Sequence, residues 1–316
     1  MPYARRRRLP YRRPTYRKKA PYGSRRATPR SYGRKRTYRK TTRKMWTRKR
    51  ILNVTSRKKK DTMQPTSGEQ STAADPPTLG PRRFVASDGQ IMVMWCPTKR
   101  RRDTFGSPGN VPTVDDPACR TATECFYRGL KERINVSTSG SSSWRWRRIC
   151  FTFKSDRFLF NPDGPLGTFT RMDEAVPPYG YLRALNAFNF NDTFQAQMAQ
   201  QIQSYMFQGT SGVDWNSTYT AKPDNERINV KYDKTRIISS GNDAGVMRDY
   251  NIWHPMNKTL VYDEDEEGGT QQNGSMSAIT KRSMGDYYVV DFIGCNDDNA
   301  EELLFNPTAT LYWHER

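Results

Sequence analysis

The positive charge of this 316-residue chain is concentrated at one end. The first 60 residues hold 26 lysines and arginines and no acidic residue, and the first acidic residue is Asp61. The whole chain has 53 basic and 32 acidic residues, so the remainder holds 27 basic against 32 acidic ones, a net charge of −5. A segment of one sign with little apolar mass cannot bury a core, because its charges repel one another. We therefore expect a disordered basic N-terminal arm over residues 1–50 and a folded body over residues 51–316.

The body shows short apolar runs between turn signals, which is the pattern of an all-β domain. In the run Trp144–Phe153, Ile149, Phe151 and Phe153 alternate with smaller residues, as in a half-buried strand. Many short strands with long polar loops favour a single jelly roll, an eight-stranded β-sandwich, over an α/β fold. The other expected strands are Ile91–Trp95, Cys125–Val136, Val213–Thr220, Arg227–Ile238, Val246–Trp253, Lys258–Tyr262, Tyr287–Ile293 and Thr308–Trp313.

One segment has helical spacing and predicts an amphipathic helix inserted in the β body. It begins after Asp192 as a candidate N-cap and ends before Gly209. We interpret its apolar stripe as core or as a subunit contact, in preference to a cofactor pocket. The stripe consists of Phe194, Met198, Ile202, Tyr205 and Met206.

Two segments near the arm complete the expected organisation. The β-prone run Ile51–Thr55 is predicted to dock on the body as a first strand. Residues 61–82 are rich in Gln, Thr, Ser and Gly and contain the turn Asp75-Pro76-Pro77. We expect them to form a mobile linker or surface loop.

The chain offers little material for catalysis or metal binding. Its five cysteines are too few and too scattered for a disulfide scaffold, and we expect reduced, buried thiols. The five-residue spacer between Cys119 and Cys125 is outside the usual zinc range, and the two histidines, His254 and His314, are sixty residues apart. The sequence has no phosphate-binding loop, no H-E-x-x-H and no G-x-S-x-G. We therefore expect no enzyme, no metal and no cofactor.

Hydropathy gives two further expectations. No window approaches about eighteen apolar residues, so we expect no membrane insertion. The N-terminus lacks the apolar stretch of a secretory signal, which favours a cytosolic or nuclear location.

The basic arm predicts binding to nucleic acid. Lysines and arginines displace counterions from the phosphate backbone, and aromatic rings among them can stack on unpaired bases. Such binding does not depend on the base sequence of the nucleic acid, because phosphate contacts do not distinguish bases. The same clusters can act as nuclear-import signals. We set aside a merely solvated surface, since no acidic residue compensates the charge. The residues predicted for nucleic-acid binding and nuclear import are Arg5, Arg6, Arg7, Arg8, Arg12, Arg13, Arg17, Lys18, Lys19, Arg34, Lys35, Arg36, Arg39, Lys40, Arg43, Lys44, Arg48, Lys49, Arg50, Arg57, Lys58, Lys59 and Lys60, and those predicted to stack on bases are Tyr11, Tyr16, Tyr38 and Trp46.

Three charged motifs of the body keep two interpretations each. The basic run Lys99–Arg102 faces the same polyanion or is an ordinary solvated loop. The run Trp144–Arg148 is a nucleic-acid-facing stripe or a packed strand with its arginine stems outward. The acidic run Asp263–Glu267 lacks the ligand spacing of a calcium loop. It is a solvated loop or a partner for a basic loop of a neighbouring subunit.

Several blocks of the sequence resemble one family. The run Ile51–Met63 (ILNVTSRKKKDTM) closely resembles the segment after the basic arm in capsid proteins of genomoviruses, the gemycircularvirus group. Further blocks that look like this family follow in the expected order from about residue 50 to 293. They are Cys125–Glu132, Trp144–Thr152, Tyr250–His254 with Met256–Lys258, and Met284–Asp291.

The resemblance implies a jelly-roll capsid protein that forms a small icosahedral T=1 shell around circular single-stranded DNA. Similarity to geminivirus coat proteins, a sister family, further implies nuclear import through the arm. The implied partners are the single-stranded DNA genome, about 60 copies of the chain itself and host nuclear import receptors. The implied locations are the virion and the host nucleus. The alternative that we keep is a cellular nucleic-acid-binding protein with a basic tail on a monomeric β body.

Overall fold

The computed structural model describes residues 45–69, 78–102, 112–158, 172, 174–176, 178–188, 190, 193–297 and 299–316. Residues Thr47–Arg316 form one compact unit and Met1–Trp46 another, of which only Met45 and Trp46 are described. The fold below is that of the unit Thr47–Arg316.

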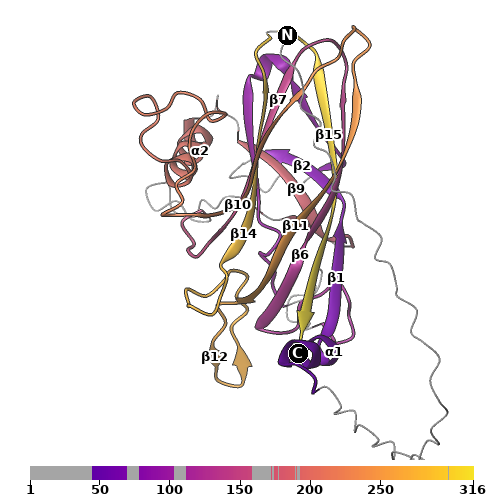
Figure 1. Cartoon of the computed structure of the whole chain (residues 1–316), viewed down its shortest axis with the longest axis vertical. Helices are drawn as coiled ribbons and strands as arrows, with labels where there is room; N and C mark the ends of the chain where they lie inside the picture. Colours follow the sequence, from indigo (N-terminus) through magenta and orange to yellow (C-terminus); the bar gives the residue numbers. More distant parts are fainter. Residues whose placement is uncertain are drawn as a thin grey trace, which may run out of the picture. The chain divides into compact units, whose positions relative to one another are not determined.

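Most of the regular structure of this unit is β-strand, and the long strands form two sheets (Figure 1). One sheet, called here the β6 sheet, has the order β1-β15-β6-β11, and β4 also pairs with β15. Its strands are β1 (Arg57–Met63), β4 (Arg82–Val85), β6 (Glu124–Thr138), β11 (Met247–Val261) and β15 (Glu302–Glu315). The other, called the β7 sheet, has the order β10-β7-β14-β5-β9-β2-β3. Its strands are β2 (Pro65–Glu69), β3 (Thr78–Leu79), β5 (Gln90–Trp95), β7 (Trp144–Phe153), β9 (Gly180–Phe188), β10 (Asn229–Ile238) and β14 (Asp286–Cys295).

The remaining elements are short or lie between these strands. They are α1 (Arg48–Thr55), the 3-10 turn η1 (Ala86–Asp88), β8 (Glu174–Val176), α2 (Thr193–Met206), β12 (Glu266–Glu267) and β13 (Thr270–Gln271). Strand β8 pairs with β9, and β12 pairs with β13 in a small hairpin.

The strand pairing is nested, and this identifies the fold. The antiparallel pairs are β4 with β15, β5 with β14, β6 with β11, and β7 with β10. Along the chain the first strand thus pairs with the last, and each later pair lies inside the one before. Alternate pairs fall in opposite sheets, so each of the two sheets contains four of these eight strands. Two Greek keys nested in this way are a jelly roll, so the all-β, jelly-roll prediction is confirmed.

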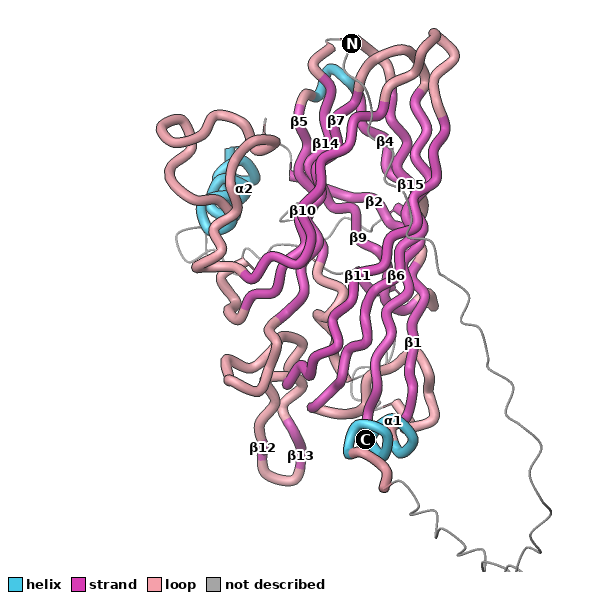
Figure 2. Tube along the Cα trace, in the orientation of Figure 1, coloured by secondary structure: helices cyan, strands magenta, loops and turns pink. Residues whose placement is uncertain are grey.

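The hydrophobic core has two layers. Between the sheets, Ile134 and Phe305 of the β6 sheet pack with Trp144, Trp146 and Ile293 of the β7 sheet. A second layer lies on the other face of the β7 sheet and contains residues of β5, β7 and β14 together with α2. Figure 2 shows α2 beside this sheet, on the side away from the β6 sheet. Every residue of β14 is consequently buried.

The inserted helix forms as predicted. The helix α2 spans Thr193–Met206, and its stripe residues Met198, Ile202 and Met206 are buried against the β7 sheet. The interpretation of the stripe as core is confirmed, whereas Asp192, the expected N-cap, lies outside the described residues.

Most predicted strands are present with small changes of boundary. Trp144–Phe153 is β7 with the predicted bounds, and the predicted strands at 91–95, 125–136, 227–238, 287–293 and 308–313 fall on β5, β6, β10, β14 and β15. The two strands expected at 246–253 and 258–262 are one strand, β11, with an irregularity between Pro255 and Lys258. Asn257, with φ 50°, lies in a β-bulge at this point. The bulge interrupts the alternation of the sequence, so one strand looks like two.

The prediction of a strand at Ile51–Thr55 is wrong. These residues are the C-terminal part of α1, which begins after Thr47, whose hydroxyl accepts a hydrogen bond from the Arg50 backbone N–H. A threonine N-cap satisfies a free donor at the helix start and outweighs the β propensity of so short a run. The first strand of the body is β1, which begins at Arg57.

Two other segments differ from expectation. Val213–Thr220 forms turns and not a strand, because the Asp214 carboxylate accepts from the Thr210 backbone N–H and Gly212 adopts a positive φ of 81°. The mobile linker expected over 61–82 is also wrong for its described parts. Asp61–Met63 belongs to β1, and β2 runs parallel to β9 from Pro65 to Glu69. Residues 70–77 lie outside the described residues.

Candidate nucleic-acid interface

Most of the predicted arm residues lie outside the described part of the chain. This applies to every predicted site residue from Arg5 to Lys44 and to Tyr11, Tyr16 and Tyr38, whose roles stay predictions. Trp46 is described, and its side chain is 51% exposed.

The helix α1 continues the basic composition of the arm into the folded unit. Its first turn holds Arg48, Lys49 and Arg50 and no acidic residue. The helix dipole disfavours cations at this end by about 0.3–1 kcal/mol each. The helix dipole therefore does not account for these three cations, and their role in nucleic-acid binding stays a prediction.

The cluster Arg57–Lys60 is divided by strand β1 into inward and outward side chains. Lys58 and Lys60 are exposed, whereas Lys59 is 4% exposed and lies 3.1 Å from a carboxylate oxygen of Glu315. Lys59 also donates to the Cys119 carbonyl at 2.8 Å. The prediction that Lys59 binds nucleic acid is wrong, because its ammonium group is buried and already paired.

Arg57 and Lys58 keep exposed positions at the start of the same strand. Arg57 lies 3.0 Å from Asp115 in an exposed ion pair, and such pairs contribute little stability. Lys58 donates to the Asn53 carbonyl at 2.9 Å, at the end of α1. Both remain open to a polyanion.

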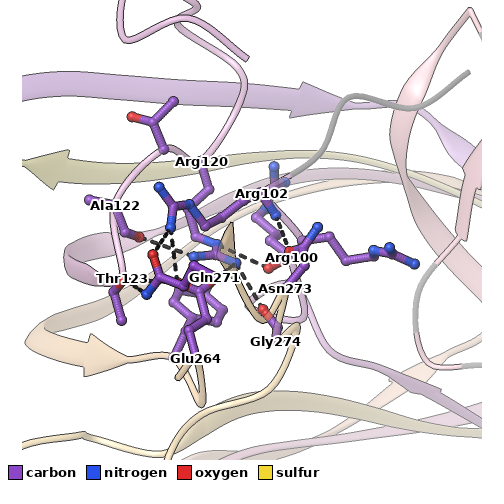
Figure 3. A network of polar contacts seen from close by, with 12 residues as sticks. Arg100, Arg102, Arg120, Ala122, Thr123, Glu264, Gln271, Asn273 and Gly274 are labelled. Atoms are coloured by element: carbon purple, nitrogen blue, oxygen red, sulfur yellow. Dashed lines mark hydrogen bonds and ion pairs between the residues drawn. The ribbon is translucent and has the colours of Figure 1, made fainter. Parts of the chain in front are cut away.

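The basic run Lys99–Arg102 and the acidic run Asp263–Glu267 meet within one chain (Figure 3). The Glu264 carboxylate, whose side chain is fully buried, lies 2.6 Å from Nη2 of Arg120 and 3.7 Å from Nη1 of Arg102. Arg120 also donates to the carbonyl oxygens of Ala122 and Gly274, at 3.1 and 2.8 Å. Glu264 is therefore part of the interior, and neither interpretation of the acidic run anticipated a partner in its own chain.

The remaining members of these runs divide between interior and solvent. Arg100 is 1% exposed and lies 2.7 Å from Asp61, with its guanidinium 4.5 Å from the ring centroid of Tyr181. Neither a polyanion nor bulk solvent reaches Arg100. Asp263, Asp265, Glu266 and Glu267 are exposed.

The run Trp144–Arg148 is a packed strand, but its arginines do not all point outward. Trp144 and Trp146 are buried between the sheets, and Arg145 is exposed. Arg147, on the α2 side, makes two hydrogen bonds to the Asp233 carboxylate at 2.9 and 2.7 Å. The sheet-packing interpretation is supported, and a nucleic-acid-facing stripe is excluded for the buried members.

Arg148 belongs to a fully buried cluster of charges between the sheets that the sequence patterns did not predict. It forms a bidentate pair with Asp291, at 2.7 and 2.8 Å, and also contacts Glu132. Arg183 bridges the same two carboxylates, at 3.2 Å from Glu132 and 3.0 Å from Asp291. His254 completes the cluster, with Nε2 3.2 Å from Glu132. Two arginines thus balance two carboxylates, which is the arrangement that buried charges require.

The cluster alters the protonation of its members. Burial alone would lower the pKa of His254, but contacts with the Cys150 sulfur and the Glu132 carboxylate raise it to about 9. Burial would raise the pKa of Glu132, yet the charges of Arg148 and Arg183 outweigh this and hold it well below its usual value. These contacts favour the protonated form of His254 inside the sandwich.

One sequence signal could have located part of this cluster. Glu132 falls in the same strand phase as Leu130 and Ile134, and Asp291 lies within the apolar run of β14. A carboxylate in the inward phase of a predicted strand indicates a buried ion pair. No comparable signal marks Arg183.

The structure also shows the state of the cysteines and bears on metal binding and membrane insertion. None of the five cysteines, all of them described, forms a disulfide, and Cys96, Cys125, Cys150 and Cys295 are buried, as expected of reduced thiols. Among the described residues, no group of three or more His, Cys, Asp or Glu side chains is placed to hold a metal ion. Within the same residues, no helix has the length and apolar character needed to cross a membrane.

Comparisons with known proteins add little to this geometry. No protein-family model and no curated protein matches the chain. Among solved structures, the unassembled KI polyomavirus VP1 pentamer is 9% identical over 82% of this chain and 95% of that chain, with a TM-score of 0.13. A TM-score this low carries no argument, so the jelly-roll assignment rests on the strand order described above.

Proposed function

We propose that this chain is a structural capsid protein, as its resemblance to genomovirus capsid proteins implies. It assembles into a small icosahedral T=1 shell and packages circular single-stranded DNA through its basic arm. The observation that carries the proposal is the connection of a jelly-roll body to a 60-residue segment with 26 cations and no acidic residue. The folded sandwich would form the wall of the shell, and the long polycationic extension would bind the polyanion on the inner side of that wall.

The charge of the body supports self-assembly. Outside the first 60 residues the net charge is −5, so neighbouring copies do not strongly repel one another. Several body cations are neutralised internally, including Arg100, Arg120 and Arg148. Binding of the polyanion therefore depends mainly on the arm and on a few exposed cations of the body.

Charge balance predicts the genome size. About 60 copies would bring about 1,560 positive charges from residues 1–60, enough for roughly 1.5–2 thousand phosphates. Lys59 is paired internally, which lowers this figure only slightly. Particles that hold DNA more than twice as long would contradict the balance.

A structural role is favoured over an enzymatic one. The strongest cluster of titratable groups, around Glu132 and Asp291, is wholly buried, and its charges are paired with one another. A general acid or base must reach a substrate proton. These groups stabilise the fold instead.

The arm also suits nuclear import, and we place the protein in the virion and the host nucleus on that ground. Deletion of residues 1–44, which leaves Thr47 and α1 intact, is expected to abolish nuclear accumulation and to weaken nucleic-acid retention strongly. The melting transition of the body should persist. Loss of that transition would instead show that the arm is part of the fold.

Size-exclusion chromatography separates the proposal from a cellular nucleic-acid-binding protein. The full-length chain, freed of nucleic acid by nuclease and high salt, should form large assemblies when single-stranded DNA is added back at low salt. A chain that stays monomeric under all such conditions would favour the cellular alternative.

A further inference from the structure

The outer face of the β6 sheet, on the side opposite the core, has an unusual composition. Along β6, Leu130, Glu132 and Ile134 point inward, and Lys131 and Arg133 point outward into solvent. The pairing register aligns the outward residues of neighbouring strands in rows. Four adjacent rows of this face are Thr308, Arg133 and Asn251; Thr62, Thr310, Lys131 and Trp253; Lys60, Tyr312, Gly129 and Pro255; and Lys58, His314, Phe126 and Thr259.

These four rows carry cations and no carboxylate, whereas the next row of the same face, Asn306, Asn135 and Asp249, holds one carboxylate, which accepts from Asn135 Nδ2 at 2.8 Å. With the neighbouring Arg128, the cations are Lys58, Lys60, Arg128, Lys131 and Arg133. Lys60, Lys131 and Arg133 are exposed and form no ion pair with any described residue. Arg100 and Arg120 are instead matched by the acids Asp61 and Glu264, so Lys60, Lys131 and Arg133 differ from them in having no ion pair among the described residues.

The pKa of His314 reflects this positive potential. Partial burial lowers it first, and the charges of Lys58 and Arg128 lower it further. The lowered pKa favours the neutral form of His314, so the positive charge of the face comes from its lysines and arginines.

Aromatic rings lie among the cations. Trp253 and Tyr312 flank Gly129, with ring centroids 6.0 Å apart and planes at 57°. A Cβ at Gly129 would lie 2.6 Å from a ring carbon of Trp253, so the glycine makes room for the indole to lie across the strand. Trp253 nevertheless stays 48% exposed. Phe126 and His314 form a second ring pair, with centroids 6.1 Å apart.

We propose that this outer face is a second binding surface for single-stranded nucleic acid, with phosphates at Lys60, Lys131 and Arg133 and bases stacked on Trp253 and Tyr312. Exposed rings within a cationic surface bind unpaired strands without reading sequence. The inference rests on the proposed function in taking nucleic acid as the partner. It adds a contact that belongs to the folded body.

The single strand is favoured over other occupants. A duplex hides the base faces that the rings would contact, and a second copy of the same face would be repelled by like charge. The last basic run of the first 60 residues, Arg57–Lys60, lies in β1 at the edge of this sheet. Ser56, directly after α1, lies 3.4 Å from His314, and α1 lies beside the C-terminal end of β15 (Figure 1).

Photo-cross-linking of the full-length chain to a short oligothymidylate tests the proposal. After ultraviolet irradiation and digestion, mass spectrometry should find cross-links at Trp253 or Tyr312 as well as in residues 1–60. The double variant Lys131→Gln with Arg133→Gln should lose the cross-links on the body and retain those in the arm. Its slope of log affinity against log salt should fall by about 1.4, since each phosphate contact with a single strand contributes about 0.7.

The matched control replaces two exposed lysines away from this face, Lys222→Gln with Lys234→Gln. Its body cross-links and salt slope should equal those of the parent chain. Cross-links confined to residues 1–60 in the parent, or a test variant indistinguishable from the control, would overturn the proposal. All four replaced residues are exposed, and a melting curve checks that each variant is folded. Particle formation is scored separately by electron microscopy, so failure of the shell proposal is distinguishable from failure of this one.

Discussion

The two sheets of the sandwich differ in what covers their outer faces. The β7 sheet is covered by α2 and its loops, and every residue of β14 is buried. The outer face of the β6 sheet is exposed and carries Lys60, Lys131, Arg133 and Trp253. The inner faces of both sheets share one core.

The difference shows that burial decides what a charged residue does in this fold. Arg148 and Lys131 come from neighbouring parts of the same chain, but Arg148 points between the sheets and Lys131 points to solvent. The first stabilises the sandwich through Asp291 and Glu132, and the second is available to a phosphate. The following variants compare the two situations directly.

The largest effect is expected for Arg148→Gln. It leaves Glu132 and Asp291 short of a buried partner, which typically costs about 3–5 kcal/mol. Arg133→Gln, on the exposed face, should change the unfolding free energy by less than about 0.5 kcal/mol. Urea unfolding of the nuclease-treated chain measures both, and equal effects would contradict the division between inner and outer faces.

The cover of the β7 sheet is tested by Ile202→Ala. This truncation removes a buried side chain of α2 and should lower the unfolding free energy by about 2–5 kcal/mol. Gln200→Ala, on the exposed side of the same helix, should leave stability nearly unchanged. A small effect at Ile202 would show that α2 does not contribute to the core.

Stability should also depend on pH through His254. Its pKa is raised to about 9 in the folded chain, so the proton stabilises the fold fully below the unfolded value near 6.5. That contribution, about 3 kcal/mol, is lost as the pH rises through 9. Melting temperatures measured from pH 6 to pH 10 should fall over this interval, and His254→Gln should remove most of the decrease. A flat profile in the parent chain would contradict the buried histidinium.

The smallest effect distinguishes two adjacent lysines. Lys60→Gln should lower the salt slope of single-stranded DNA binding by about 0.7 and leave the melting temperature unchanged. Lys59→Gln should do the reverse, because it removes the partner of Glu315. Identical behaviour of the two variants would contradict the alternation assigned to β1.

The strand pattern of the sequence predicted much of the fold. Alternation in Trp144–Phe153 gave β7 with its bounds, but the strand is buried on both faces, between the sheets and under α2, and is not half-buried as expected. The stripe of Met198, Ile202 and Met206 predicted α2, because this helix buries a single apolar face. Apolar periodicity thus located both elements, although it did not show that the second face of β7 is covered.

The failures have two physical causes, a local helix cap and partners that are distant in sequence. Ile51–Thr55 was expected as a strand, but a cap at Thr47 decides the local structure, and a propensity scan does not weigh it. Lys59 and Glu264 were grouped with charged runs, although strand phase and distant partners bury them. Ion pairs between residues far apart in sequence, such as Arg120 with Glu264, are set by the tertiary fold and leave no local signal.

The central claim is that this jelly roll assembles into a closed shell around nucleic acid. Negative-stain electron microscopy of the full-length, purified and nuclease-treated protein tests it most directly. The account predicts closed particles of uniform diameter that protect single-stranded DNA of roughly 1.5–2 thousand nucleotides. Dispersed monomers with no protected nucleic acid would contradict it.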